Sequence, residues 1–117
     1  MPVEMGRAEF ERLVDAALDS IPEEIARLIR NVAVIVEDDP PPDDPDLLGL
    51  YDGVALTERY GEPGMVLPDR IFVYRHPLLE FCDDVEQLAD EVRITVVHEV
   101  AHHFGIDDAR LDELGYA

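Results

Sequence analysis

The sequence is organised around residues 98–108, near its C-terminal end, which read HEVAHHFGIDD. His98 and His102 are four residues apart, so on a helix their side chains lie one turn from each other on the same face. Two imidazoles at this spacing can bind one zinc ion. Glu99, next to the first histidine, is placed to act as general base on a water molecule at that metal.

The residues after His102 suggest a third ligand. Gly105 can adopt the positive φ that ends a helix, and acidic side chains follow directly. A catalytic zinc ion needs three protein ligands and one open position. The spacing favours Asp108 over Asp107 as the third ligand. The alternative is a helix that carries two ordinary core histidines and no metal.

His103 also belongs to this stretch, but its expected role is different. At 3.6 residues per turn it points about 100° away from His102 around the helix. It therefore cannot share the metal while the helix stays intact. We expect it to support the ligands or to pack.

Upstream, the sequence predicts that one long helix leads into His98. Asp83 and Glu86 form a pair typical of a capping box. Apolar residues then recur at helical spacing: Val85, Leu88, Ala89, Val92 and Val96. The β-branched run 94–97 alone favours a strand, but the longer pattern favours the helix.

The first part of the chain predicts two helices and a strand. Residues 6–20 have apolar side chains at helical spacing, and Pro22 with two glutamates suits the first turn of a second helix that ends near Arg30. Residues 32–36 form a β-branched run that predicts a well-buried strand. The proline- and aspartate-rich residues 38–46 predict a solvated loop.

The middle and the end of the chain are less regular. Residues 47–56 are consistent with two short strands or with one strand and an irregular crossing, and residues 57–68 predict a loop. Residues 70–75 predict a strand, and we expect it at a sheet edge because Pro77 follows it closely. Residues 107–114 predict a short final helix, ended by a glycine.

Composition limits the possible partners. The 117 residues suit a single domain, and 28 acidic against 9 basic residues give a net charge of -19. Such a charge repels phosphate backbones and anionic lipids, so we expect no nucleic-acid or membrane partner. The single Cys82 and the lack of an apolar leader predict a cytoplasmic protein, with Cys82 as a small buried side chain. The sequence leaves the oligomeric state open.

The quoted stretch resembles the His-Glu-x-x-His-x-x-Gly-x-x-Asp form of the zincin metallopeptidases, and most of the chain resembles the small bacterial minimal zincins. This resemblance implies an α+β fold in which a small mixed sheet packs on two main helices, one of them the metal-binding helix. It implies a zinc-dependent peptidase acting on peptides or proteins. By position, His98, His102 and Asp108 would be the metal ligands and Glu99 the base.

The resemblance also implies an edge strand along the substrate cleft. By that likeness, residues 71–74 are the candidate, with Phe72, Tyr74 and His76 as possible substrate-strand or oxyanion-stabilising residues. Other possible donors are Tyr60, Arg93 and Tyr116. The chain departs from the extended zincins because no methionine follows Asp108.

Two other functions compete with the peptidase. A non-enzymatic zincin-like binding module would use a structural or vestigial metal site and dock a basic partner on its acidic surface. A metal-dependent ribonuclease is the remote alternative, because one RNA-processing family uses a related histidine arrangement. The sequence lacks the basic track that RNA binding requires.

Overall fold

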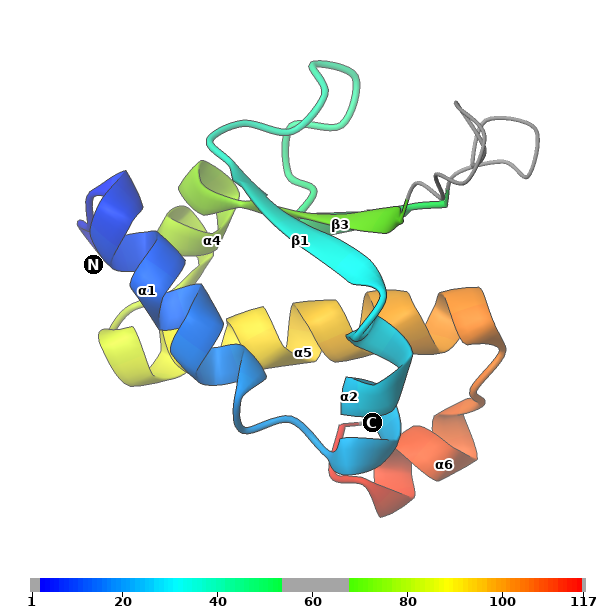
Figure 1. Cartoon of the computed structure of the whole chain (residues 1–117). Coiled ribbons are helices and arrows are strands. Elements are labelled where there is room, and N and C mark those ends of the chain that lie inside the picture. The colour runs from blue at the N-terminus through cyan, green and yellow to red at the C-terminus, as the bar shows by residue number, and fades with distance from the viewer. Residues whose placement is uncertain (1–2, 54–67, 117) are drawn as a thin grey trace.

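The computed structural model describes residues 3–53 and 68–116 of the chain. Within these residues the fold is α+β, with helices arranged around a three-stranded mixed sheet (Figure 1). The helices are α1 (Arg7–Leu18), α2 (Glu23–Ile29), α4 (Arg75–Phe81), α5 (Val85–Phe104) and α6 (Asp108–Glu113). The strands are β1 (Val32–Glu37), β2 (Gly49–Asp52) and β3 (Asp69–Tyr74). The predicted fold class is confirmed.

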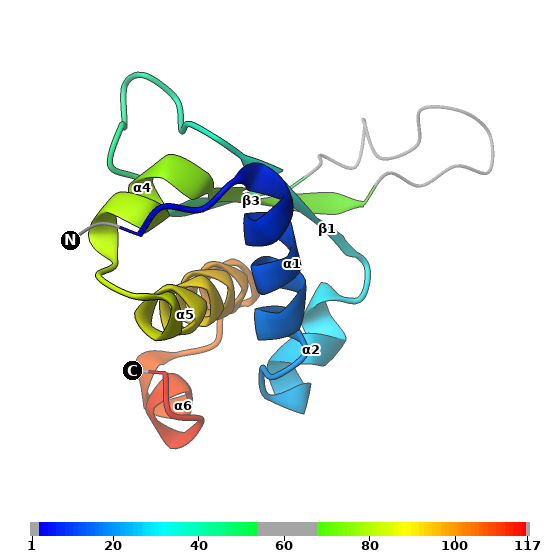
Figure 2. The ribbon, with the colours of Figure 1, turned by 90° about the vertical axis from the view of Figure 1, so that its left-hand side faces the viewer.

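Helix α5 lies under the sheet and contacts most other elements. It packs against β2 and β3 above, and against α1, α2 and α4. Turned by 90°, the molecule shows α1 and α2 on one side of α5, with α4 above α5 toward the other side (Figure 2). Short α6 lies below α5.

The sheet has the order β1-β3-β2, with β1 parallel and β2 antiparallel to β3. The expectation that residues 70–75 form an edge strand is therefore wrong: β3 is paired on both sides. Strand β1 is also less buried than its sequence predicts, because it lies at an edge and only Val36 is buried. The expected substrate strand is thus the central strand.

Pro77 has a different meaning from the one its position suggests. It lies in the first turn of α4, a helix that the sequence did not predict. A backbone N–H in that turn has no partner within the helix, so proline costs little there. The proline marks the start of a helix immediately after β3.

The long helix is confirmed, with its beginning one residue later than expected. The N-cap is Asp84, whose side chain accepts from the backbone N–H of Gln87 at 2.8 Å. The Gln87 side chain in turn accepts from the N–H of Asp83 at 2.9 Å. The cap is therefore built from the Asp84 side chain, Gln87 and the backbone N–H of Asp83, and these bonds do not involve Glu86.

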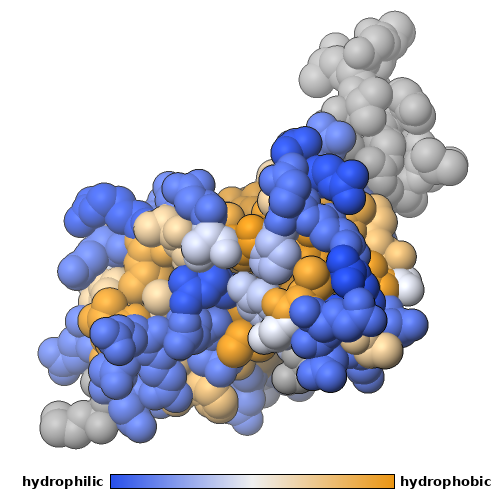
Figure 3. Space-filling model, turned by 90° about the horizontal axis from the view of Figure 1, so that it is seen from below, coloured by the Kyte–Doolittle hydropathy of each residue, from blue (hydrophilic) through white to orange (hydrophobic). Residues whose placement is uncertain are grey.

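The core lies between the sheet, α5 and the flanking helices. Val92, Val96 and Val100 on α5 are fully buried, as are Ile71 and Val73 on β3. This accounts for a helix of β-branched residues, since both the sheet and the neighbouring helices cover it. Seen from below, the surface is largely hydrophilic, with apolar side chains emerging between polar ones (Figure 3).

The segment 38–46 contains no helix or strand, as predicted. The loop predicted at 57–68 lies almost entirely outside the described residues. Of the helices described, none is long and apolar enough to cross a membrane.

Candidate metal centre

Helix α5 brings His98 and His102 together. Their ring centroids are 5.8 Å apart, with the rings at 83° to each other. His98 is half-buried and His102 is exposed. Two imidazoles on adjacent turns, one of them open to solvent, are suitable in kind and position as two zinc ligands.

Glu99 is half-buried on the same helix, between Thr95 and His103, which contact the two ends of the β2 segment at Gly49 and Gly53. Its position follows from its neighbours: Thr95, one turn before it, lies directly under Gly49. A Cβ atom on Gly49 would be only 2.5 Å from Thr95 Cγ2. The absence of a side chain at Gly49 thus allows β2 to approach α5 closely beside Glu99.

The turn after the histidines forms as predicted. Gly105 has φ 74°, and the N–H of Ile106 donates to the carbonyl of Ala101 at 2.8 Å. This Schellman arrangement ends α5 and turns the chain into α6. The predicted positive-φ exit at Gly105 is confirmed.

The two aspartates after this turn have different environments. Asp107 is the N-cap of α6, and its side chain accepts from the N–H of Arg110 at 2.9 Å. Asp108 is the first residue of α6 and is exposed. The carboxylate of Asp107 is thus already used by the helix end, which leaves Asp108 as the freer ligand.

The structure does not bring Asp108 to the histidine pair. In the described residues, no three histidine, cysteine, aspartate or glutamate side chains are grouped closely enough to hold a metal ion. The Nε2–H of His98 donates instead to the main-chain carbonyl of Tyr116. The two histidines are of the residue type and helical spacing that zinc sites use, and their role as ligands, like that of Asp108, stays a prediction.

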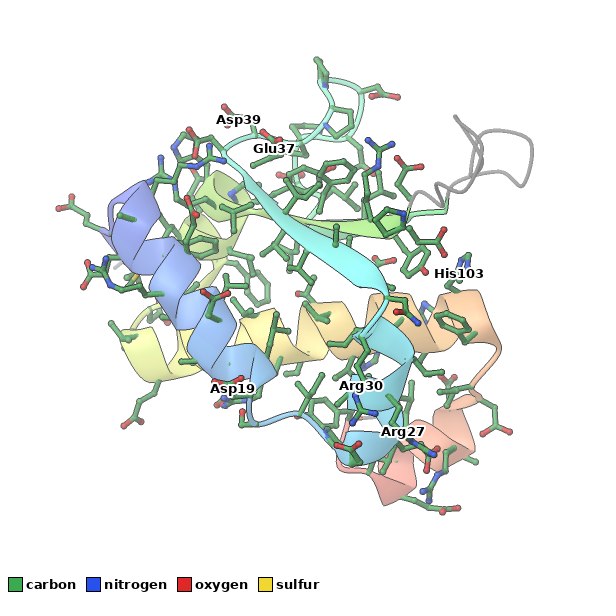
Figure 4. All side chains as sticks on the ribbon, viewed as in Figure 1. Asp19, Arg27, Arg30, Glu37, Asp39 and His103 are labelled. Atoms are coloured by element: carbon green, nitrogen blue, oxygen red, sulfur yellow. The ribbon has the colours of Figure 1, made fainter. Side chains whose placement is uncertain are left out.

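His103 points up from α5 toward the sheet (Figure 4). Its ring stacks on Tyr51 of β2 with centroids 3.9 Å apart, and its Nε2 lies 3.8 Å from Oδ2 of Asp69. The Tyr51 hydroxyl donates to the same carboxylate oxygen at 2.6 Å. These contacts tie β2 and β3 to the end of α5, which agrees with the packing role expected for His103 as one of two alternatives.

The other predicted site residues are spread out. Phe72 and Tyr74 lie on β3, where Tyr74 is buried and loss of hydration raises its pKa. His76 is exposed on α4 and pairs with Asp39 at 2.8 Å. Tyr74 ends β3 and His76 follows it, at the opposite end of the strand from Asp69. The structure therefore does not group them with the histidine pair.

Two of the other possible donors are also placed. Arg93 pairs with Asp90 and bonds Ser20, while Tyr116 meets His98 through its main chain. Tyr60 lies outside the described residues. None of the donors named from the sequence is assigned an oxyanion role by these contacts.

Sequence reasoning missed two features of this region. The first is that β2 is an edge strand that lies against α5, whereas β3 also contacts α5 but is the central strand. Strand β2 was hard to recognise in the sequence, because Gly49 lies close to Asp52 and Gly53, and such a segment favours a turn as much as a strand. The second is the carbonyl of Tyr116 at His98, which has no sequence signal because it is a main-chain atom.

Comparisons with known proteins bear on the family and the fold. The family model described as zincin-like metallopeptidase matches residues 29–116. A solved structure described as a conserved hypothetical protein from Thermo thermophilus has 24% sequence identity and a TM-score of 0.55, covering 90% of this chain and 99% of that chain. It supports the fold alone. No curated protein matches the chain. The match over residues 29–116 shows that this chain belongs to the zincin-like metallopeptidase family.

Proposed function

We propose that the protein is a zinc-dependent peptidase in which His98, His102 and Asp108 hold the metal and Glu99 is the general base. The observation that carries the proposal is the pair of imidazoles 5.8 Å apart on α5, on the helix that passes under edge strand β2. Zinc bound there would supply Lewis acidity and lower the pKa of a water from about 15.7 to about 7.

Each residue of this chain then has a defined task. Glu99 takes a proton from the attacking water and delivers it to the nitrogen of the leaving amine as the peptide C–N bond breaks. Asp107 caps α6 and so fixes the start of that helix, at Asp108. The proposal requires the carbonyl of Tyr116 to release His98 when the metal binds.

The substrate strand in this proposal is β2. It is an edge strand of the described sheet and lies against α5, whereas β3 is paired on both sides. An extended peptide that adds to a sheet edge gains main-chain hydrogen bonds. A peptide beside β2 would pass above the part of α5 that carries Glu99, since Gly49 lies over Thr95 one turn earlier.

The test is to measure zinc per chain and the hydrolysis of unstructured peptides by the zinc-loaded protein. Glu99→Gln should keep its zinc but lose about a hundred-fold or more in kcat, because general acid–base catalysis contributes about 10²–10⁴-fold. Glu91→Gln is the matched control: it removes one half-buried carboxylate from α5 outside the motif, and its activity should stay near that of the unmodified protein.

Two outcomes would reject the proposal. One is hydrolysis that Glu99→Gln leaves unchanged in a zinc-loaded protein, since the activity would then come from elsewhere. The other is a protein whose melting temperature falls on chelation but which cleaves no peptide. That result would favour the binding module with a structural metal.

A further inference from the structure

The surface beside the N-terminal end of β2 is hollowed. A hollow of about 240 Å³ is lined by Leu48, Pro77 and Phe81 together with Asp46 and Glu80. Phe81 is 56% exposed. An aromatic ring this exposed at the wall of a hollow offers an apolar contact that no described part of this fold covers.

The hollow adjoins the start of edge strand β2. The carbonyl of Leu48 accepts from the N–H of Tyr74 at 3.0 Å, so pairing with β3 already begins one residue before Gly49. In an extended peptide beside β2, alternate side chains point to opposite faces of the sheet. A peptide residue opposite Leu48 would direct its side chain to the face on which Leu48 lines the hollow.

The negative charge of Asp46 and Glu80 indicates which kind of side chain the hollow would bind. Neither the Asp46 nor the Glu80 carboxylate has a side-chain hydrogen bond or an ion pair in the part of the chain that the structure describes. A guanidinium group pairs with carboxylates through its fork of N–H donors, and its flat face stacks on aromatic rings. We propose that this hollow binds the arginine side chain of an extended peptide lying along β2, with Asp46 and Glu80 on the guanidinium and Phe81 against its face.

The spacing links the hollow to the proposed active site. Glu99 is one turn beyond Thr95, about 6 Å along α5, and Thr95 lies under Gly49. An extended peptide covers that length in about two residues. The arginine would therefore lie about two or three residues from the bond that Glu99 serves. Only this position rests on the proposed function; the binding of arginine does not.

The experiment compares two peptides by fluorescence anisotropy at low ionic strength. Both are short, extended and identical, except that one carries arginine and the other citrulline, which has the same shape without the charge. Binding is measured on the zinc-loaded Glu99→Gln protein, so that no peptide is consumed. We expect the arginine peptide to bind about five-fold more tightly.

Paired variants locate the effect. D46N/E80Q should bring the ratio of the two affinities to about one. The matched control is D43N/D44N, which removes the same charge from neighbouring exposed residues that do not line the hollow; it should keep the preference. Equal binding of both peptides, or an equal loss of preference in the control, would overturn the inference.

The result separates this inference from the proposed function. If peptide hydrolysis depends on Glu99 but arginine is not preferred, the proposed arginine binding in the hollow is wrong and the proposed peptidase activity stands. If D46N/E80Q removes an arginine preference in a protein that cleaves no peptide, the proposed arginine binding stands and the proposed peptidase activity is wrong.

Discussion

The Nε2–H of His98 donates a hydrogen bond to the main-chain carbonyl of Tyr116, eighteen positions further along the chain. A carbonyl oxygen can only accept, so this imidazole nitrogen carries the proton and cannot at the same time bind a metal. Zinc binding through Nε2 must therefore break the contact between α5 and the segment after α6.

The first prediction follows from that competition. Zinc should remove the Nε2 proton of His98 and shift the amide signal of Tyr116, as measured by ¹H–¹⁵N NMR during a zinc titration. His98→Ala should abolish both changes. Zinc binding with the His98 Nε2–H signal intact would contradict the prediction, because the metal would then use another atom or another site.

The second prediction separates the two aspartates after Gly105. Asp108→Asn should weaken zinc binding by about a hundred-fold or more, since it removes a proposed ligand. Asp107→Ala should instead cost about 1 kcal/mol of the free energy of unfolding in zinc-free protein, since it removes the N-cap of α6. Zinc competition and urea denaturation measure the two effects. Similar zinc affinities for both variants would contradict the assignment of Asp108.

The sequence was a good guide wherever the signal was local. The period of apolar residues and the glycine at 105 predicted α5 and its end, because a helix and its caps are built from residues close together in the chain. The order of the strands could not be predicted from the sequence, because Pro77 favours an edge strand as much as a helix start. Only the pairing of β3 with two distant strands decides between these readings.

The candidate site divides in the same way. His98 and His102 could be paired from their spacing alone. The partners of His103 could not, since Tyr51 and Asp69 come from separate strands that meet only when the sheet forms on α5. The position of Asp108 relative to the histidines depends on how α6 packs, which no local pattern determines.

The third prediction concerns the contact between β2 and α5. Gly49→Ala should cost about 1–3 kcal/mol in the free energy of unfolding, because the new Cβ would meet Thr95 Cγ2 at 2.5 Å. Thr95→Ser removes that methyl group and should recover part of the loss. Recovery should be incomplete, since the carbonyl of Phe72 also lies 3.1 Å from the new atom. A double-mutant cycle in urea measures the coupling, and strictly additive effects would contradict the predicted clash.

The fourth prediction concerns Cys82 at the junction of α4 and α5. The side chain is fully buried, and loss of hydration raises the pKa of its thiol to about 11. Almost no thiolate is therefore present at pH 8, and a disulfide reagent should label the folded protein only slowly. Labelling should become fast in urea, as the chain unfolds. Rapid stoichiometric labelling of the folded protein at pH 8 would show that this junction opens readily.

The fifth prediction concerns the ion pair that holds α6 against α2. The guanidinium group of Arg110 bonds both carboxylate oxygens of Glu24, which lowers the pKa of Glu24. A carboxyl group whose pKa is lower in the folded protein stabilises it above the pKa of the unfolded chain. That contribution is lost as the pH falls through the folded value.

Glu24→Gln should therefore unfold at lower urea concentration than the unmodified protein at neutral pH, and the difference should shrink as the solution is acidified. Glu113→Gln is the control, since Glu113 also pairs with Arg110 but lies within α6; it leaves the link between α6 and α2 in place. Each variant is compared with the unmodified protein by urea denaturation, from neutral to acidic pH. A difference between Glu24→Gln and the unmodified protein that stays constant with pH would show that the Glu24 carboxylate does not stabilise the fold through its charge.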